Sequence, residues 1–187
     1  ELVGPVVSQT IKANKKAIKK SETFAGKSIV AELIHRQSGL KIRWKSILKN
    51  GSNYIKQEFS FSTSDSLRID KIGLIQLPVN NNLTCNGVVA GSPITGNDMF
   101  FALEHPMSQF DTLATNTYGI SIKRHVPLTT STLTFTAVCG VTAPDQLRRS
   151  FLYYLERERA VPYHHQLHYN SWYDISWSDR KMDEKQC

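Results

Sequence analysis

The chain has 187 residues, of which 40% are hydrophobic, 21% charged and 10% aromatic. This composition is typical of a globular protein and excludes a disordered tail, a collagen and a disulfide-rich mini-protein. A run of about 18 apolar residues, the minimum expected for a transmembrane helix, does not occur, so we expect no membrane span.

The net charge of +7 comes from the first part of the chain. Residues 1–50 carry eleven Lys and Arg against three Asp and Glu, and the remaining residues are close to neutral. The lysines between Lys12 and Lys20 fall on both faces of an extended segment, without interleaved aromatic residues. Nucleic-acid-binding surfaces usually combine one basic face with stacking aromatics. We therefore predict no nucleic-acid partner and interpret these lysines as solvated groups that protect a sheet edge.

Residues 6–135 contain short apolar runs with strand-like alternation, bounded by turn residues. Ser38-Gly39 and Asn50-Gly51 are typical of tight hairpin turns, where glycine adopts a positive φ. This regular spacing of short strands and turns predicts an antiparallel β-sandwich over residues 1–143. The expected strands are 5–12, 28–36, 40–49, 53–61, 67–76, 86–91, 98–104, 118–126 and 131–140.

The pattern changes at Pro144, where apolar residues recur at spacings of three and four. Leu147, Phe151, Tyr154 and Leu155 follow this spacing, so a linker helix is expected within 144–162. Residues 163–187 then resemble a strand, a short loop and the start of a second helix, as at the beginning of a βα unit. We expect the chain to be the front part of a longer protein, with a truncated catalytic domain from residue 163.

The segment from His168 to Asp174 is the densest candidate site. A short apolar strand ends in Asn170, Trp172, Tyr173 and Asp174. Aromatic and acidic side chains at the carboxyl end of such a strand suit a sugar, because the ring packs on its C–H face and the carboxylate accepts hydroxyl hydrogen bonds. Burial at a domain junction explains the same residues equally well.

Glu104 and His105, followed by Pro106, form a second candidate for substrate binding. Adjacent strand residues point to opposite faces, which favours the alternative of a structural ion pair and a turn. The three histidines His164, His165 and His168 lack a standard zinc spacing, and no G-x-G-x-x-G motif opens a helix. We expect neither a metal nor another cofactor.

The tail resembles the entry to the catalytic barrel of clan-D glycoside hydrolases, the α-galactosidase and α-N-acetylgalactosaminidase clan. The first barrel strand of that clan carries an Asn-Ser-Trp motif, which is similar to Asn170-Ser171-Trp172 here. The strings 151–159 and 100–108 resemble α-galactosidase-like enzymes of Bacteroidetes. In such enzymes a β-supersandwich of the galactose-mutarotase-like type precedes a (β/α)8 barrel.

This resemblance implies a retaining glycosidase acting on α-linked galactose or N-acetylgalactosamine glycosides. The two catalytic aspartates of the clan lie on later barrel strands. A whole barrel needs about 250 residues, so no catalytic residue is expected in this chain. Trp172 and Asp174 are implied to contact substrate, the sandwich to pack on the barrel, and the protein to be exported to the periplasm or cell surface.

Two other readings belong to different functional classes. A stand-alone carbohydrate-binding module would expose a planar set of aromatics on one face of the sandwich, and Trp44, Tyr54 and Phe59 are the candidates. A purely structural domain would make no ligand contact at all.

Overall fold

The computed structural model of the chain describes residues 1–78, 83–114, 117–165 and 167–168. It contains two antiparallel sheets, a single turn of 3-10 helix named η1 and one α-helix, α1. The prediction of a mainly antiparallel β-sandwich followed by a helix is confirmed. The elements are β1 (Val7–Ile11), η1 (Lys20–Thr23), β2 (Gly26–His35), β3 (Leu40–Lys49), β4 (Tyr54–Ser62), β5 (Lys71–Pro78), β6 (Thr84–Cys85), β7 (Ile94–Gly96), β8 (Met99–Leu103), β9 (Gln109–Ala114), β10 (Thr117–Lys123), β11 (Leu133–Val141) and α1 (Leu147–Glu158).

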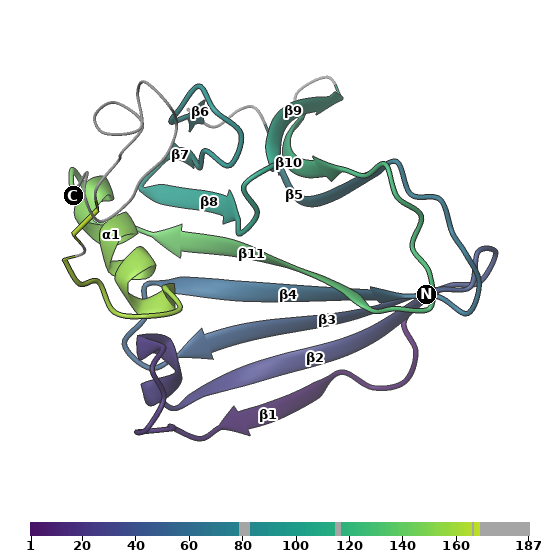
Figure 1. Cartoon of the computed structure of the whole chain (residues 1–187), viewed down its shortest axis with the longest axis horizontal. Helices are drawn as coiled ribbons and strands as arrows, with labels where there is room; N and C mark the ends of the chain where they lie inside the picture. Colours follow the sequence, from purple (N-terminus) through teal and green to yellow (C-terminus); the bar gives the residue numbers. More distant parts are fainter. Residues whose placement is uncertain (79–82, 115–116, 166, 169–187) are drawn as a thin grey trace, which may run out of the picture.

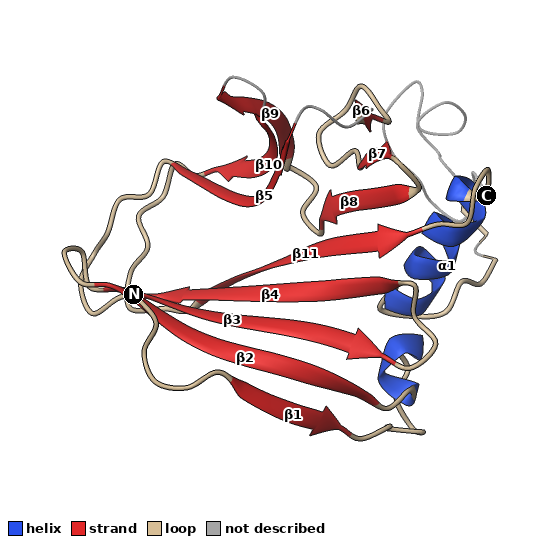
Figure 2. Cartoon of the chain, turned by 180° about the vertical axis from the view of Figure 1, so that it is seen from behind, coloured by secondary structure: helices blue, strands red, loops and turns tan. Residues whose placement is uncertain are grey.

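The larger sheet has eight strands in the order β1-β2-β3-β4-β11-β8-β7-β6, and the smaller sheet has three in the order β5-β10-β9. In Figures 1 and 2 the smaller sheet lies on the β8 and β11 side of the larger one. Strands β1, β2 and β3 fan away from it. The smaller sheet therefore covers only part of the larger sheet.

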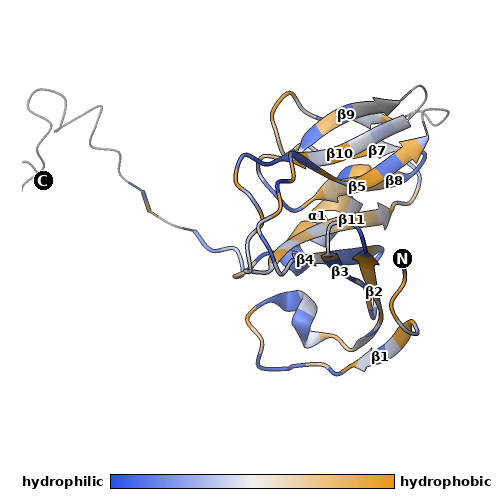
Figure 3. Ribbon diagram, turned by 90° about the vertical axis from the view of Figure 1, so that its right-hand side faces the viewer, coloured by the Kyte–Doolittle hydropathy of each residue, from blue (hydrophilic) through white to orange (hydrophobic). Residues whose placement is uncertain are grey.

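Alternation along the strands separates two hydrophobic clusters on the two faces of the larger sheet. Phe135 and Ala137 of β11 point into the core between the sheets, whereas Val138 belongs to the cluster beneath α1. The hydropathy colouring of Figure 3 shows apolar residues where β5, β8 and β11 come together. The first cluster is formed by Phe61, Ile72, Ile75, Ile94, Phe101, Leu103, Ile120, Ile122, Leu128, Phe135 and Ala137.

The two predicted hairpin turns connect β2 to β3 and β3 to β4. Gly39 has a φ of 67° and Gly51 a φ of 70°, a region that glycine adopts without steric cost. A third turn joins β7 to β8, where Asn97 and Asp98 have φ values of 51° and 56°. Asparagine and aspartate tolerate this conformation better than other side chains.

One predicted strand is wrong. Residues 86–91 form a loop in which Val88 and Val89 are exposed and Gly91 has a φ of 85°. Valines favour a strand by propensity, but none of the described strands pairs with them.

The lysine-rich segment begins where β1, the edge strand of the larger sheet, ends. Lys12, Lys15, Lys16 and Lys20 are exposed in the loop and in η1, not along the edge itself. Lys19 is different, because its ammonium group pairs with Glu158 of α1.

Candidate functional site

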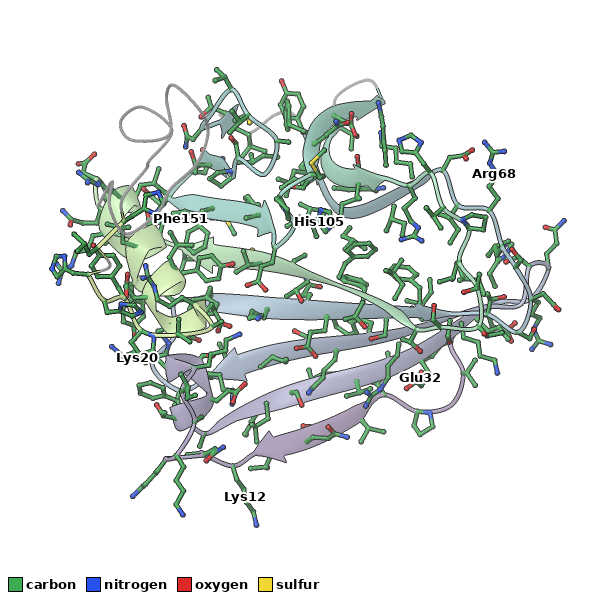
Figure 4. All side chains as sticks on the ribbon, viewed as in Figure 1. Lys12, Lys20, Glu32, Arg68, His105 and Phe151 are labelled. Carbon is green, nitrogen blue, oxygen red and sulfur yellow. The ribbon has the colours of Figure 1, made fainter. Side chains whose placement is uncertain are left out.

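Helix α1 packs across the end of the larger sheet, on the face opposite the smaller sheet (Figure 1). Leu147, Phe151 and Tyr154 lie on one side of the helix and contact the sheet, whereas Leu155, which was grouped with them in the sequence, is exposed. The Phe151 ring meets Phe100 of β8 edge-on, with ring centroids 5.2 Å apart. This apolar contact fixes the helix over β4, β8 and β11, and the side chain of Phe151 is labelled in Figure 4.

Beside this contact lies an ion network that joins four separate segments. Lys56 of β4 places Nζ 2.9 Å from a carboxylate oxygen of Glu158 and 3.2 Å from one of Glu104. Lys19 Nζ lies 2.7 Å from the same Glu158 oxygen. The side chains of Lys56 and Glu158 are only 11% and 7% exposed. Because water is largely excluded, these pairs attract more strongly than surface pairs do.

Two tyrosines complete the network. Tyr54 donates its hydroxyl hydrogen to Glu158 at 2.8 Å, and Tyr154 donates to Glu104 at 2.7 Å. Burial and the neighbouring carboxylates raise the pKa of both phenols well above the usual value. The tyrosines therefore stay protonated and act as donors, and each carboxylate receives both a cation and a phenol.

The network determines the protonation of Glu158 and Lys56. Burial alone would raise the pKa of Glu158, but Lys56, Lys19 and Tyr54 hold it at about 2. Burial would likewise lower the pKa of Lys56, yet Glu104 and Glu158 outweigh it and raise the pKa above its usual value. Both groups are charged over the whole physiological range.

The structure places the predicted site residues Glu104 and His105 on different surfaces. Glu104 belongs to the network just described. The ring of His105 lies edge-on to Phe135 at 5.7 Å, and its Nδ1 accepts a hydrogen bond from the backbone N–H of Met107 at 3.1 Å. These contacts match an ion pair and a turn; contact of either residue with a substrate stays a prediction.

Arg157 was not predicted to matter, and it is only 1% exposed. Its guanidinium lies 4.0 Å from the ring centroid of Phe24. It also donates to the carbonyl of Asn50 at 3.1 Å and to the hydroxyl of Tyr153 at 2.9 Å. The sequence analysis grouped Arg157 with the charged residues of the helix; its spacing of three residues from the buried Tyr154 was the signal that could have placed it nearer the sheet.

The three aromatic residues considered for sugar binding do not share a face. Trp44 and Phe59 are direct partners across β3 and β4 and line one open groove. Tyr54 is buried on the opposite face beneath α1, so its assignment to an exposed aromatic set is wrong. Strand parity explains this, because Tyr54 and Phe59 are five residues apart on one strand.

The groove lies between the uncovered part of the larger sheet and the edge strand β5, and has a volume of about 530 Å³. Trp44 donates its ring N–H to Oε1 of Gln57 at 2.9 Å, which fixes the ring in the groove wall. The groove is lined by Leu33, Leu40, Ile42, Trp44, Gln57, Phe59, Phe61, Ile69, Lys71, Ile72, Gly73 and Leu74.

The tail motif lies outside the described residues, so the predicted contacts of Asn170, Trp172, Tyr173 and Asp174 with a substrate stay predictions. Within the ranges that the structure describes, no three His, Cys, Asp or Glu side chains gather as a metal site would require. The helices in these ranges are too short or too polar to cross a membrane.

Comparison with known proteins gives little. No family model and no curated protein matches the sequence. Among solved structures, the crystal structure of the GH36 α-galactosidase AgaA from Geobacillus stearothermophilus matches with a TM-score of 0.41 and 10% sequence identity. The match covers 72% of this chain and 27% of that enzyme, so the chain spans about a quarter of its length. The likeness is coarse, and neither the fold nor the site described above rests on it.

Proposed function

We propose that the chain is the non-catalytic N-terminal part of a glycoside hydrolase that acts on α-galactose or N-acetylgalactosamine glycosides. In this proposal the sandwich carries helix α1, and the catalytic domain packs on the outer side of that helix. The carbohydrate class is supported by the resemblance of Asn170-Ser171-Trp172 to the first barrel strand of the clan. The catalytic carboxylates would lie outside this chain.

The observation that carries the proposal is that α1 has apolar residues on two sides. The apolar residues of the inner side pack against the sheet, as described above. On the outer side Leu152 is 45% exposed and Leu155 38% exposed, three residues apart and therefore on one face. A helix between sheet and solvent normally has one apolar side. The second side supports the packing of another domain there.

The surface beside these leucines is hollowed. A depression of about 750 Å³ lies between α1 and the end of the larger sheet, and Val141 and Tyr153 are among its exposed apolar residues. Apolar atoms make up most of its open surface, although Lys20, Arg149 and Glu156 also line it, and such a surface suits the packing of another domain. The next residues along the chain, from 163, are those whose sequence resembles the start of a barrel.

The size of the native protein tests the proposal first. An antibody to this domain should detect, in the source cells, a protein several-fold heavier than 21.2 kDa. A band at the mass of this chain would leave no room for a barrel, and the glycosidase proposal would fall.

The activity of the native protein tests the substrate class. The longer protein should hydrolyse p-nitrophenyl α-galactoside or α-N-acetylgalactosaminide, whereas this chain alone should not. Trp172→Ala and Asp174→Ala should each lower kcat/KM by about 100-fold or more, because they remove substrate contacts. Unchanged turnover in both variants would instead support a purely structural role for this chain.

A second candidate function is carbohydrate binding by the sandwich itself. The groove that holds Trp44 and Phe59 favours it, because two aromatic rings in one open groove offer apolar faces to sugar rings. Titration of the 187-residue chain with galactose-containing oligosaccharides, followed by calorimetry, should show binding. No binding at millimolar concentrations would exclude this function.

A further inference from the structure

A second groove adjoins the aromatic groove at the end of the molecule opposite α1. It has a volume of about 560 Å³ and shares Ile69 and Lys71 with the aromatic groove. In Figure 4 Arg68, one of its lining residues, lies far from Phe151 of α1. The second groove is lined by Arg68, Ile69, Asp70, Lys71, Lys123, Arg124, His125, Val126 and Pro127.

This groove is basic. Its four permanent cations are Arg68, Lys71, Lys123 and Arg124. Two carboxylates lie close to them: Asp70 pairs with Arg68 at 3.1 Å and Asp111 pairs with Lys71 at 2.7 Å. Four cations against two carboxylates leave an excess of two positive charges.

Arg124 is held in place as part of the groove wall. Its backbone N–H donates to the carbonyl of Asp70 at 2.8 Å, and its Nη2 donates to the carbonyl of Val126 at 3.0 Å. Its Nε is buried, and within the described residues it has no hydrogen-bond partner. The buried Nε cannot reach a ligand, but a guanidinium held in this way still presents its remaining Nη–H donors, and such donors suit a sulfate or a carboxylate, which can accept two hydrogen bonds at once.

We propose that the two grooves together bind an acidic oligosaccharide, one that carries sulfate or carboxylate groups on pyranose rings. Trp44 and Phe59 would contact the C–H faces of sugar rings, and Lys123 and Arg124 would bind the acidic groups of a neighbouring unit. This inference rests on the second candidate function, sugar binding by the sandwich, and adds the class of sugar.

Charge and shape favour this ligand over a nucleic acid. The cations occupy one end of an otherwise apolar groove, whereas a nucleic-acid surface would carry them along the whole path of a phosphate backbone. The lysines between Lys12 and Lys20 do not extend this path, because Lys12 lies at a distant corner of the molecule (Figure 4). A ligand with both apolar ring faces and a few anionic groups matches the lining.

The test is calorimetric titration of the 187-residue chain with three probes: a sulfated galactan hexasaccharide, the same hexasaccharide after desulfation, and a hexamer of galacturonate. The sulfated or the uronate probe should bind about tenfold more tightly than the desulfated one at low salt. The difference should shrink as salt is raised, because exposed charges are screened. Comparing the sulfated probe with the uronate probe shows whether the site prefers sulfate or carboxylate groups.

Four variants locate the site. Lys123→Gln should weaken binding of the acidic probe about threefold to tenfold and leave the desulfated probe unaffected. Trp44→Ala should weaken binding of the acidic and the desulfated probes alike. Trp44→Phe should keep most of the affinity, which would show that the fold is intact. Lys12→Gln, an exposed lysine outside both grooves, should change neither.

If neither the sulfated nor the uronate probe bound more tightly than the desulfated probe, the inference would be overturned, but neutral sugar binding would stand. Failure of all three probes would overturn both. The inference would also fall if Lys12→Gln weakened the acidic probe as much as Lys123→Gln, since binding would then follow net charge. Tighter binding of a single-stranded oligonucleotide of similar charge would overturn it as well.

Discussion

Glu158 joins α1 to β4 and to the segment before η1 through one carboxylate. The same carboxylate accepts the hydroxyl hydrogen of Tyr54. Its pKa is about 2 in the folded protein and 4.5 in an unfolded chain. A carboxyl whose folded pKa is lowered stabilises the fold above its unfolded pKa, and that contribution is lost as the pH falls toward the folded value.

We therefore expect Glu158→Gln to lower the free energy of unfolding by about 2–3 kcal/mol at pH 7, and by close to nothing near pH 2. Urea denaturation of both proteins between pH 2 and 7 measures the difference. Glu156→Gln is the matched control, because Glu156 is an exposed residue of the same helix that pairs with Arg159. It should change stability by less than about 0.5 kcal/mol at any pH. A pH-independent loss in Glu158→Gln would contradict the assignment.

At the residue scale, this network was not predicted, because Tyr54 was assigned to an exposed aromatic set and Lys56 was not singled out. Strand parity places Lys56 on the same face as Tyr54, two residues earlier. Its partners were not visible, since Glu104 and Glu158 are 48 and 102 residues away. Pairing over such distances depends on how β8 and α1 return to β4, which no local pattern specifies.

At the scale of elements, Gly140 of β11 lets α1 approach the sheet through Phe100. A Cβ atom at Gly140 would lie 2.0 Å from Cζ and 2.3 Å from Cε1 of the Phe100 ring. Phe100 is fully buried and packs against Phe151 and Tyr154 of the helix. The ring therefore has no free space into which it can move.

Gly140→Ala should consequently destabilise the protein by about 1–3 kcal/mol, the usual cost of forcing extra atoms into a packed core. Thermal unfolding, followed by circular dichroism, measures the loss. Gly73→Ala in β5 is the control, because an added Cβ there meets no atom within 4 Å and the backbone needs no positive φ. A loss in Gly73→Ala equal to that in Gly140→Ala would show that the effect is a general property of glycine replacement.

The sequence was more informative about strands than about their arrangement. The alternation in residues 40–49 and 53–61 predicted β3 and β4 closely, because both strands are long and the turn between them carries Asn50-Gly51. Strand β7 was missed since three residues are too few to show a period. The place of β11 between β4 and β8 was also hidden, because it depends on contacts far apart along the chain.

At the scale of the whole molecule, two apolar surfaces are left uncovered by the part of the chain that the structure describes, and they lie on different sides. One is the groove beside β5, on the face of the larger sheet that the smaller sheet covers only in part. The other is the outer side of α1. The regular spacing of short strands predicted a sandwich, but it did not predict how much of one sheet the other covers. How much of the larger sheet is covered depends on where β5, β9 and β10 pack over it.

The outer side of α1 offers a test that separates a docking surface from an incidental one. Leu152→Gln combined with Leu155→Gln should change the stability of the 187-residue chain by less than about 1 kcal/mol, since both side chains are exposed and glutamine is a good helix former. In the longer protein, the same double variant should lower the unfolding temperature of the catalytic domain or its activity, because polar amides would then be buried without partners.

Phe151→Ala provides the contrast, because its ring packs on the inner side of the helix against Phe100. It should destabilise the short chain and the longer protein alike, by about 3 kcal/mol or more. If the double glutamine variant left the longer protein unchanged, the outer leucines would not be a docking surface. The two-sided apolar character of α1 would then no longer support a catalytic domain packed against it.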